Sequence, residues 1–110
     1  MAQSRYVLIE SRDPFESNDA AYAYELAASL ARTGQPVTVF LVQNGVLPAR
    51  PGARTPALEA LARAGVEVLA DEFSLRERGI GRDRLAPCVA PAPIDVVVER
   101  LAAGAKVFWH

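Results

Sequence analysis

The chain has 110 residues, a length that predicts one domain covering residues 1–110, and its 51% hydrophobic and 23% charged residues are typical of a soluble globular protein. A net charge of -1 gives no electrostatic attraction to nucleic acid or to an anionic membrane surface. No apolar run approaches the roughly 18 residues of a membrane span, and the N-terminus has no signal-peptide pattern. We therefore expect a cytoplasmic protein that meets neither nucleic acid nor membrane.

Metal and disulfide chemistry are also excluded by composition. One Cys cannot form an internal disulfide framework, and one Cys with one His cannot build a Cys-rich metal site. A Gly-rich phosphate loop of the G-x-G-x-x-G or Walker type is not present, which argues against a nucleotide. We therefore expect no metal and no cofactor.

The first third of the chain predicts a strand and a long helix. Arg5 to Glu10 is apolar on both faces, as in a central parallel strand covered by helices. After a loop, Asn18 is expected to cap a helix that ends at Gly34. Tyr24 lies off the apolar stripe of this helix and is expected at an interface. The stripe recurs every four residues and consists of Tyr22, Leu26 and Leu30.

The middle of the chain predicts a strand, a mobile loop and a helix. Pro36 to Gln43 is rich in Val and aromatic residues, which favours a strand. Leu47 to Ala53 contains two Pro residues and a Gly and is expected to be a surface loop. Thr55, with Pro56 at the first helical position, then opens a helix that closes at Gly65.

The segment from Val66 to Ile80 predicts a strand that runs directly into a short helix. Val66, Val68 and Ala70 are apolar at every second position, as in a half-buried strand. Asp71 and Ser74 are alternative N-caps for a helix stopped by Gly79. Free backbone N–H groups at such a junction stabilise an anion.

The last third predicts two strands and one more helix. Leu85 to Ala90 is a short strand that its prolines confine to a sheet edge, and Lys106 to Trp109 is the final strand. Between them, Pro93 starts a helix whose inward residues are expected to be Ile94, Val97, Val98 and Leu101. Strands that alternate with helices predict an α/β fold: a single open, mostly parallel sheet of four to five strands flanked by helices, flavodoxin-like.

Several motifs, in this order and spacing, carry a family resemblance over nearly the whole chain. They are D-P-F-E-S at Asp13 to Ser17, V-Q-N-G-V at Val42 to Val46, L-A-D-E-F-S-L-R-E-R-G at Leu69 to Gly79, D-V-V-V-E-R-L from Asp95, and Trp109 near the end. The chain resembles the DsrE/DsrF/DsrH (TusD/TusC/TusB) family of small sulfur-relay proteins, with a pattern nearest DsrH/TusB. The resemblance implies a DsrE-like domain, assembly into homo- or hetero-oligomers, a sulfur-relay partner protein, and carriage of persulfide sulfur between thiols.

Many members of that family carry a reactive Cys eight residues before a matching R-G or R-R-G, and some carry a second Cys five residues before it. Those positions are Asp71 and Ser74 in this chain. Asp71 keeps an anion at the helix N-terminus but cannot act as the sulfur nucleophile. The resemblance therefore predicts an oligomer-forming member that is not catalytic by itself.

Two alternatives stay open. Cys88 is the only thiol and is the candidate catalytic residue of a persulfide carrier or sulfurtransferase, although its apolar neighbours in an edge strand favour an inert thiol. A second hypothesis is a binding module for a small anion or ligand at the carboxyl edge of the sheet. Its candidate ligand-binding residues are Ser11, Ser17, Asn18, Asn44, Asp71 and Ser74.

The last two residues are given structural roles. Trp109 is expected to be buried in the sheet or in a subunit contact. His110 has no base or nucleophile near it in the sequence and is expected to be an ordinary surface residue.

Overall fold

A parallel sheet forms the centre of the molecule in the computed structural model, which describes residues 5–53 and 55–110. Within these ranges the sheet has five strands in the order β4-β3-β2-β1-β5, and every neighbouring pair is parallel. The strands are β1 (Tyr6–Glu10), β2 (Val37–Leu41), β3 (Glu67–Asp71), β4 (Val89–Ala92) and β5 (Lys106–Trp109). The predicted class, an open parallel α/β sheet flanked by helices, is confirmed.

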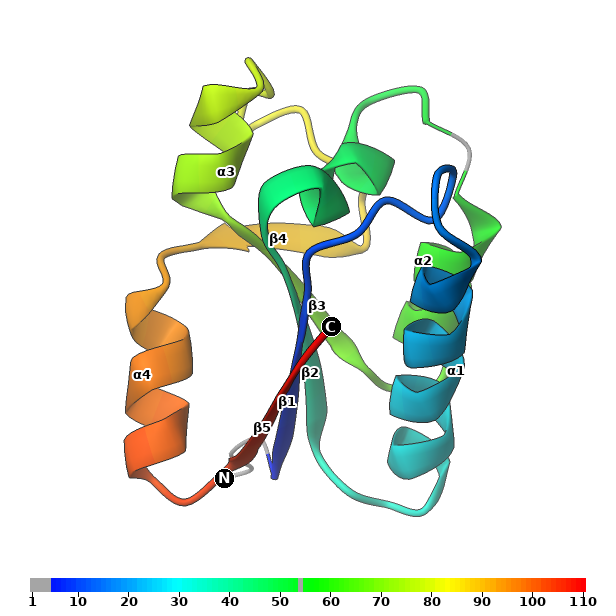
Figure 1. Ribbon diagram of the computed structural model, residues 1–110, viewed down its shortest axis with the longest axis vertical. Helices are drawn as coiled ribbons and strands as arrows, with labels where there is room; N and C mark the ends of the chain where they lie inside the picture. The colour runs from blue at the N-terminus through cyan, green and yellow to red at the C-terminus, as the bar shows by residue number, and fades with distance from the viewer. Residues whose placement is uncertain (1–4, 54) are drawn as a thin grey trace.

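Helices cover both faces of this sheet. They are α1 (Asn18–Arg32), α2 (Pro56–Arg63), α3 (Glu72–Glu77) and α4 (Asp95–Ala102), with a 3-10 helix, η1, over Gln43–Ala49. Figure 1 shows α1 and α2 on one side of the sheet and α4 on the other. Because side chains alternate along a strand, β1 contributes Leu8 to the core beneath α1 and α2, and Val7 and Ile9 to the core beneath α4.

The central strands are buried because both of their faces are covered. Every residue of β2 is buried, and all of β1 after Tyr6 is buried as well. The strand predicted as half-buried is also covered on both faces, since Leu69 packs on the α4 side while Val68 and Ala70 pack on the α1 side. Continuous apolar runs of this kind are typical of parallel sheets.

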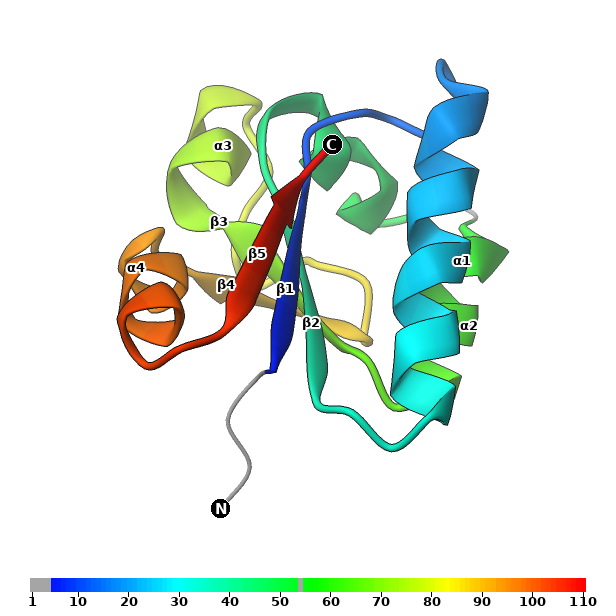
Figure 2. The same ribbon diagram turned by 60° about the horizontal axis from the view of Figure 1, so that its bottom comes forward.

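The strand order reverses at β1. Strands β1 to β4 advance in one direction across the sheet, whereas β5 returns to pair with the free side of β1 (Figure 2). Tyr6 lies opposite Lys106, and Ile9 lies opposite Trp109. The carboxyl ends of the first and last strands are therefore side by side, at the kind of switch point where open α/β sheets usually bind ligands.

The predicted inward face of α1 is wrong at Tyr22 and Leu26, although Leu30 does pack against the core. Tyr22 is 82% exposed and Leu26 is 47% exposed, whereas Tyr24 is buried in the core beneath the helix. Small residues occupy the rest of the buried face, which consists of Ala20, Ala23, Ala27 and Ala28. Alanines let the helix approach the sheet closely, so the larger side chains of the neighbouring stripe remain outside. The cap is also Ser17 rather than Asn18, which is the first helical residue.

The face of α4 was also predicted too broadly. Val97 is buried against the sheet, but Ile94, Val98 and Leu101 are each at least 45% exposed. These three residues recur at the spacing of one helix face, so the outer side of α4 carries an apolar stripe. We refer to Ile94, Val98 and Leu101 as the α4 stripe.

Two other loops differ from expectation. The segment after β2 is not an irregular loop, because its first part forms η1, which packs in the core through Val46 and Ala49. The fourth strand begins at Val89 rather than Leu85 and includes Pro91. It does lie at the sheet edge, as its prolines predict.

Candidate functional site

Asp71 and Ser74, the residues at the family's Cys positions, form one hydrogen-bonded unit at the start of α3. Asp71 ends β3 and is the N-cap of the helix. Its Oδ2 accepts hydrogen bonds from the backbone N–H of Ser74 at 3.0 Å and from the Ser74 hydroxyl at 2.7 Å. The predicted cap is thereby confirmed for Asp71. A carboxylate satisfies the free N–H groups of this helix end and complements its dipole.

The same unit fixes the loop that follows β2. Gln43 donates its backbone N–H to the Ser74 hydroxyl oxygen at 2.8 Å and has a positive φ of 52°. The Ser74 hydroxyl is therefore both a donor and an acceptor within the protein. Asp71 and Ser74 are both buried. Their polar atoms therefore connect β3, α3 and η1 at this junction.

Asn44 joins this cluster through Arg78. The guanidinium of Arg78 donates to Asn44 Oδ1 through Nε at 3.2 Å and through Nη2 at 3.0 Å, and to the backbone carbonyl of Ser74 through Nη1 at 3.2 Å. The Arg of the R-G sequence thus ties α3 to η1. Asn44, Asp71 and Ser74 are the predicted ligand-binding residues that the fold brings together.

The other predicted edge residues lie over β1, β5 and α1. Ser11 donates its hydroxyl to the backbone carbonyl of His110 at 2.8 Å and joins the ends of β1 and β5. Ser17 and Asn18 begin α1, and the Ser17 side chain makes no capping hydrogen bond. They belong to a second region of the carboxyl edge, centred on β1 rather than on β3.

Cys88 lies at the opposite end of the sheet from all these residues. It precedes β4 instead of lying within it, and Val89, the next residue, pairs with Val68 near the amino end of β3. Its side chain packs partly against the core beneath α1 and α2. Burial raises the pKa of the Cys88 thiol, and the negative charge of Glu59 raises it further, while a backbone hydrogen bond acts in the opposite direction. These surroundings favour the protonated, unreactive thiol.

Sequence analysis missed a pair formed by Glu10 and His110. Glu10 is fully buried at the end of β1, and its Oε1 lies 2.8 Å from Nδ1 of His110. Glu10 Oε2 also accepts the backbone N–H of Arg12 at 2.9 Å. His110 is therefore not an ordinary surface residue. The available signal was a charged residue that ends an otherwise apolar strand, because a buried carboxylate requires partners.

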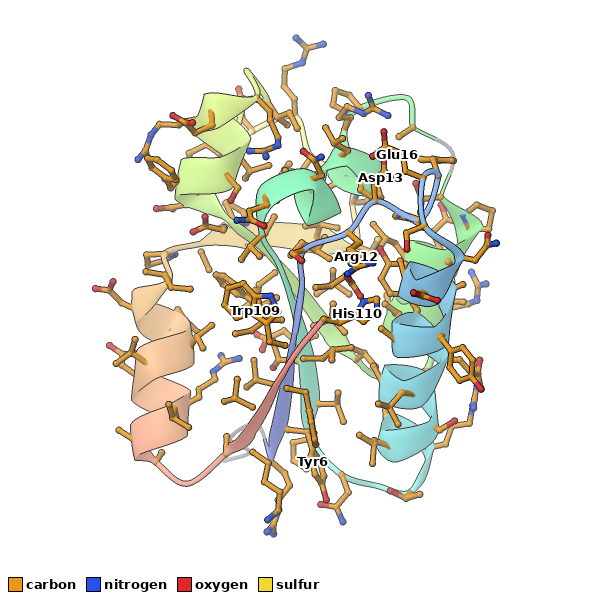
Figure 3. The ribbon with its side chains drawn as sticks, in the orientation of Figure 1. Tyr6, Arg12, Asp13, Glu16, Trp109 and His110 are labelled. Carbon is orange, nitrogen blue, oxygen red and sulfur yellow. The ribbon has the colours of Figure 1, made fainter. Side chains whose placement is uncertain are left out.

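Tyr24 and Asp13 lie near this pair. The Tyr24 hydroxyl is buried and has no hydrogen-bond partner in the described part of the chain. Burial raises the pKa of this hydroxyl, and the charges of Glu10 and Asp13 raise it further. Asp13 is buried as well and accepts the backbone N–H of Phe15, which shapes the loop after β1. Figure 3 shows Arg12, Asp13 and His110 around the carboxyl ends of β1 and β5.

An open groove of about 450 Å³ begins beside His110 and runs between α1 and β5. It exists because α1 covers β1 and β2 but leaves the edge strand β5 uncovered on that side (Figure 2). Its lining is mostly apolar and consists of Leu8, Asp19, Tyr22, Ala23, Leu26, Phe108, Trp109 and His110. Trp109 was expected to be buried in the sheet or in a subunit contact. It is 67% exposed, so it is not buried in the sheet.

The described residues offer neither a membrane-spanning helix nor a cluster of metal ligands. Among residues 5–53 and 55–110, none of the helices combines the length and apolar character needed to cross a membrane. The same residues contain no group of three or more His, Cys, Asp or Glu side chains that could hold a metal ion.

The open parallel sheet covered by helices on both faces defines a small α/β protein. The model of the DsrE/DsrF-like family matches residues 4–109, and the chain belongs to that family. The family predicted from the sequence motifs is thereby confirmed. A comparison with curated proteins found no match.

Solved structures show the same fold at low sequence identity. The YchN protein of E. coli superposes with a TM-score of 0.86 at 19% identity, over 98% of this chain and 100% of its own. Protein MTH1491 of Methanobacterium thermoautotrophicum gives a TM-score of 0.72 at 20% identity, over 98% and 100%. Protein BT1422 of Bacteroides thetaiotaomicron gives 0.70 at 14% identity, over 96% and 95%. These similarities establish the fold of the whole described chain.

Proposed function

We propose that this chain is an oligomer-forming member of the DsrE/DsrF-like family that takes part in persulfide sulfur transfer without carrying the sulfur itself. Family membership supports the pathway. The observation that carries the non-catalytic role is the Asp71–Ser74 unit. At the position where relatives have a reactive thiol, this chain has a carboxylate whose oxygen is used to cap α3 and bind the Ser74 hydroxyl.

The rest of the junction supports the same conclusion. The backbone N–H of Gln43 donates to the Ser74 hydroxyl, and Arg78 donates to the Ser74 backbone carbonyl. The family's Cys positions are therefore part of a fixed connection between α3 and η1 in this chain. A sulfur carrier needs an accessible thiolate, whereas Asp71 is buried and already hydrogen-bonded. A role like that of DsrH/TusB, in which a subunit contributes surface and shape to a partner's chemistry, fits this arrangement.

The apolar α4 stripe supports assembly. Ile94, Val98 and Leu101 expose between 45% and 61% of their surface on one helix face, which is unfavourable unless another protein covers it. Figure 3 shows the Trp109 side chain on the same side of the sheet as α4. We propose that this side contacts another subunit, either a second copy or a sulfur-relay partner.

Intact-mass spectrometry after incubation with a persulfide donor tests the non-catalytic role. Neither the wild-type protein nor the Cys88→Ser variant is expected to gain sulfur, because the only thiol is inert. A gain of one or more sulfur atoms in the wild type alone would identify Cys88 as a carrier and overturn the proposal. Circular dichroism of both proteins controls for folding.

Size-exclusion chromatography with light scattering tests the assembly. Wild-type protein, alone or mixed with sulfur-relay proteins, is expected to form a complex that Val98→Glu disrupts, because a charge in an apolar interface loses its hydration. Tyr22→Glu, at another exposed hydrophobic position but on α1, is the control and is expected to leave the complex intact. A strict monomer that binds none of the sulfur-relay proteins would contradict this part of the proposal.

A further inference from the structure

The carboxyl ends of β1 and β5 hold the features of a ligand site that the sulfur-transfer role does not use. The strand order reverses between these two strands, and ligands of open α/β sheets usually bind at such a position. Glu10 ends β1, and His110 follows β5 directly. The family position at Asp71 lies two strands away, at the end of β3.

Glu10 determines which nitrogen of His110 remains available. Both carboxylate oxygens of Glu10 lie within 2.9 Å of His110 Nδ1, and because a carboxylate only accepts, the N–H at Nδ1 is the donor in this contact. When the ring is neutral, Nε2 is the acceptor. No described residue forms a hydrogen bond with Nε2, and His110 lines the groove. The neutral His110 ring therefore presents one oriented hydrogen-bond acceptor to an apolar groove.

Glu10 is buried at a cost that only its partners offset. Its side chain is fully inaccessible and accepts from His110 and from the Arg12 backbone. A buried carboxylate that holds an imidazole through Nδ1 is the arrangement by which proteins fix the tautomer and orientation of a working His. This second observation separates the site from a simple exposed apolar face.

The groove walls select a flat apolar molecule. Tyr22 and Leu26 form one wall on α1, and Phe108 forms the other on β5. Phe108 is itself held by stacking on Tyr6, with ring centroids 6.3 Å apart and an interplanar angle of 16°. The Phe108 ring on one side, with Tyr22 and Leu26 on the other, favours an aromatic ring between them. The volume, about 450 Å³, is in the range of small-molecule sites.

We propose that the groove between α1 and β5 binds a small aromatic molecule that carries one phenolic hydroxyl group, which donates its hydrogen bond to Nε2 of the neutral His110 ring. The aromatic ring lies between Leu26 and Phe108. This inference is independent of the proposed role in sulfur transfer, because it uses none of the residues at the Asp71 junction or on the α4 stripe.

The charges at the groove disfavour a carboxylate ligand. Asp19 lines the groove near His110, and the guanidinium of Arg12 already pairs with it at 4.0 Å. The two groups that could attract an anion, His110 and Arg12, thus each already lie beside a carboxylate, Glu10 and Asp19 respectively. A neutral donor such as a phenol is accepted without bringing a third negative charge into the groove.

The test is a titration of isotope-labelled protein followed by backbone amide NMR, with 4-ethylphenol, ethylbenzene and 4-ethylbenzoate as probes. The phenol is expected to shift the amides of Leu26, Phe108 and His110 and to leave those of α4 unchanged. Ethylbenzene, which lacks the donor, is expected to bind about tenfold more weakly. The benzoate is expected to bind more weakly than the phenol.

Matched variants locate the site. Leu26→Ser removes part of one wall and is expected to weaken phenol binding about tenfold, whereas Leu101→Ser, a similarly exposed Leu on α4, leaves it unchanged. His110→Ala is expected to abolish the preference for the phenol over ethylbenzene. If His110→Ala does not fold, the probe series on wild-type protein and the Leu26 variant still decide.

Three results would overturn the inference. The first is equal binding of the phenol and ethylbenzene, which would remove His110 from the site. The second is binding that Leu26→Ser does not weaken. The third is a shift of the Leu26, Phe108 and His110 amides with protein concentration alone, which would show that a second copy of the chain covers the groove.

Discussion

Glu10 and His110, 100 positions apart in the chain, join the ends of the first and last strands through a contact of 2.8 Å between a buried carboxylate and an imidazole nitrogen. The backbone repeats this connection, because His110 donates its N–H to Ile9 and accepts the N–H of Ser11. The edge strand β5 is otherwise paired on one side only. The pair therefore fixes β5 to the sheet at the place where the proposed groove begins.

Removal of His110 is expected to destabilise the fold. In His110→Ala, Glu10 stays buried and loses its imidazole partner, which costs about 2 kcal/mol of unfolding free energy. Urea denaturation measures the change. The control is Arg32→Ala, which breaks the exposed Arg32–Glu25 ion pair and is expected to cost about 0.5 kcal/mol or less. Equal losses of unfolding free energy in the two variants would show that the Glu10–His110 contact stabilises the fold no more than an exposed ion pair.

Asp71 is expected to contribute through hydrogen-bond acceptance rather than through charge alone. Asp71→Ala removes the acceptor for the Ser74 N–H and hydroxyl and is expected to cost about 2 kcal/mol, the upper end of measured caps. Asp71→Asn keeps a carbonyl oxygen and is expected to retain at least half of that stability, because Asn caps nearly as well as Asp. Thermal and urea unfolding of the two variants give the comparison. A loss as large for Asn as for Ala would mean that the negative charge dominates.

A thiol placed at Asp71 is expected to restore sulfur uptake. In Asp71→Cys/Cys88→Ser the new thiol lies at the N-terminus of α3, where free backbone N–H groups stabilise a thiolate. Intact mass after treatment with a persulfide donor should show added sulfur. Cys88→Ser alone is the control and should show none. An unreactive thiol at this position would indicate that burial, and not only residue identity, has closed the site.

Cys88 is expected to react slowly with alkylating agents near neutral pH. Burial raises the pKa of its thiol, so less thiolate is present than in a free thiol such as glutathione. The alkylation rate, followed by mass spectrometry, should continue to rise at pH values where glutathione has reached its plateau. Urea-unfolded protein is the control and should match glutathione. A plateau in the folded protein at or below that of glutathione would contradict the prediction.

The same pKa shift makes a small contribution to the pH dependence of folding. The unfolded chain releases the Cys88 proton at a lower pH than the folded chain, so this contribution to stability is complete below the pKa of the unfolded thiol. It is lost as the pH rises toward the higher pKa of the folded protein. Cys88→Ser should remove this component from a stability profile measured between neutral and alkaline pH.

The strands could be predicted because their signal is local, whereas the helix faces could not. Val7, Ile9 and Phe40 belong to continuous apolar runs that leave no choice but a covered strand. In α1, two stripes compete, and hydrophobicity favours the one with Tyr22 and Leu26. The helix instead packs on the sheet through the other stripe, because its alanines allow close contact. Which stripe faces inward therefore depends on the packing against the sheet and not on the helix sequence alone.

One part of the candidate site could likewise be predicted from the local sequence, and another part could not. The cap at Asp71 could be predicted because the residue, the strand before it and the helix after it are contiguous. The Glu10–His110 contact could not, because it depends on β5 pairing with β1, and strand order is not written in any local pattern. The apolar run from Leu85 to Ala90 predicts a strand that contains Cys88, but β4 begins only at Val89, so Cys88 lies just before it at the amino edge of the sheet.

Replacement of Tyr24 is expected to stabilise the protein. Its hydroxyl is buried without a hydrogen-bond partner among the described residues and lies near the charges of Glu10 and Asp13. Tyr24→Phe keeps the ring in the core and removes the unpaired group, which should raise the unfolding free energy by about 1 kcal/mol. Tyr22→Phe, at an 82% exposed position on the same helix, is the control and should change little. Destabilisation by Tyr24→Phe would show instead that an internal water satisfies the hydroxyl and that the region around Glu10 is a hydrated polar cluster.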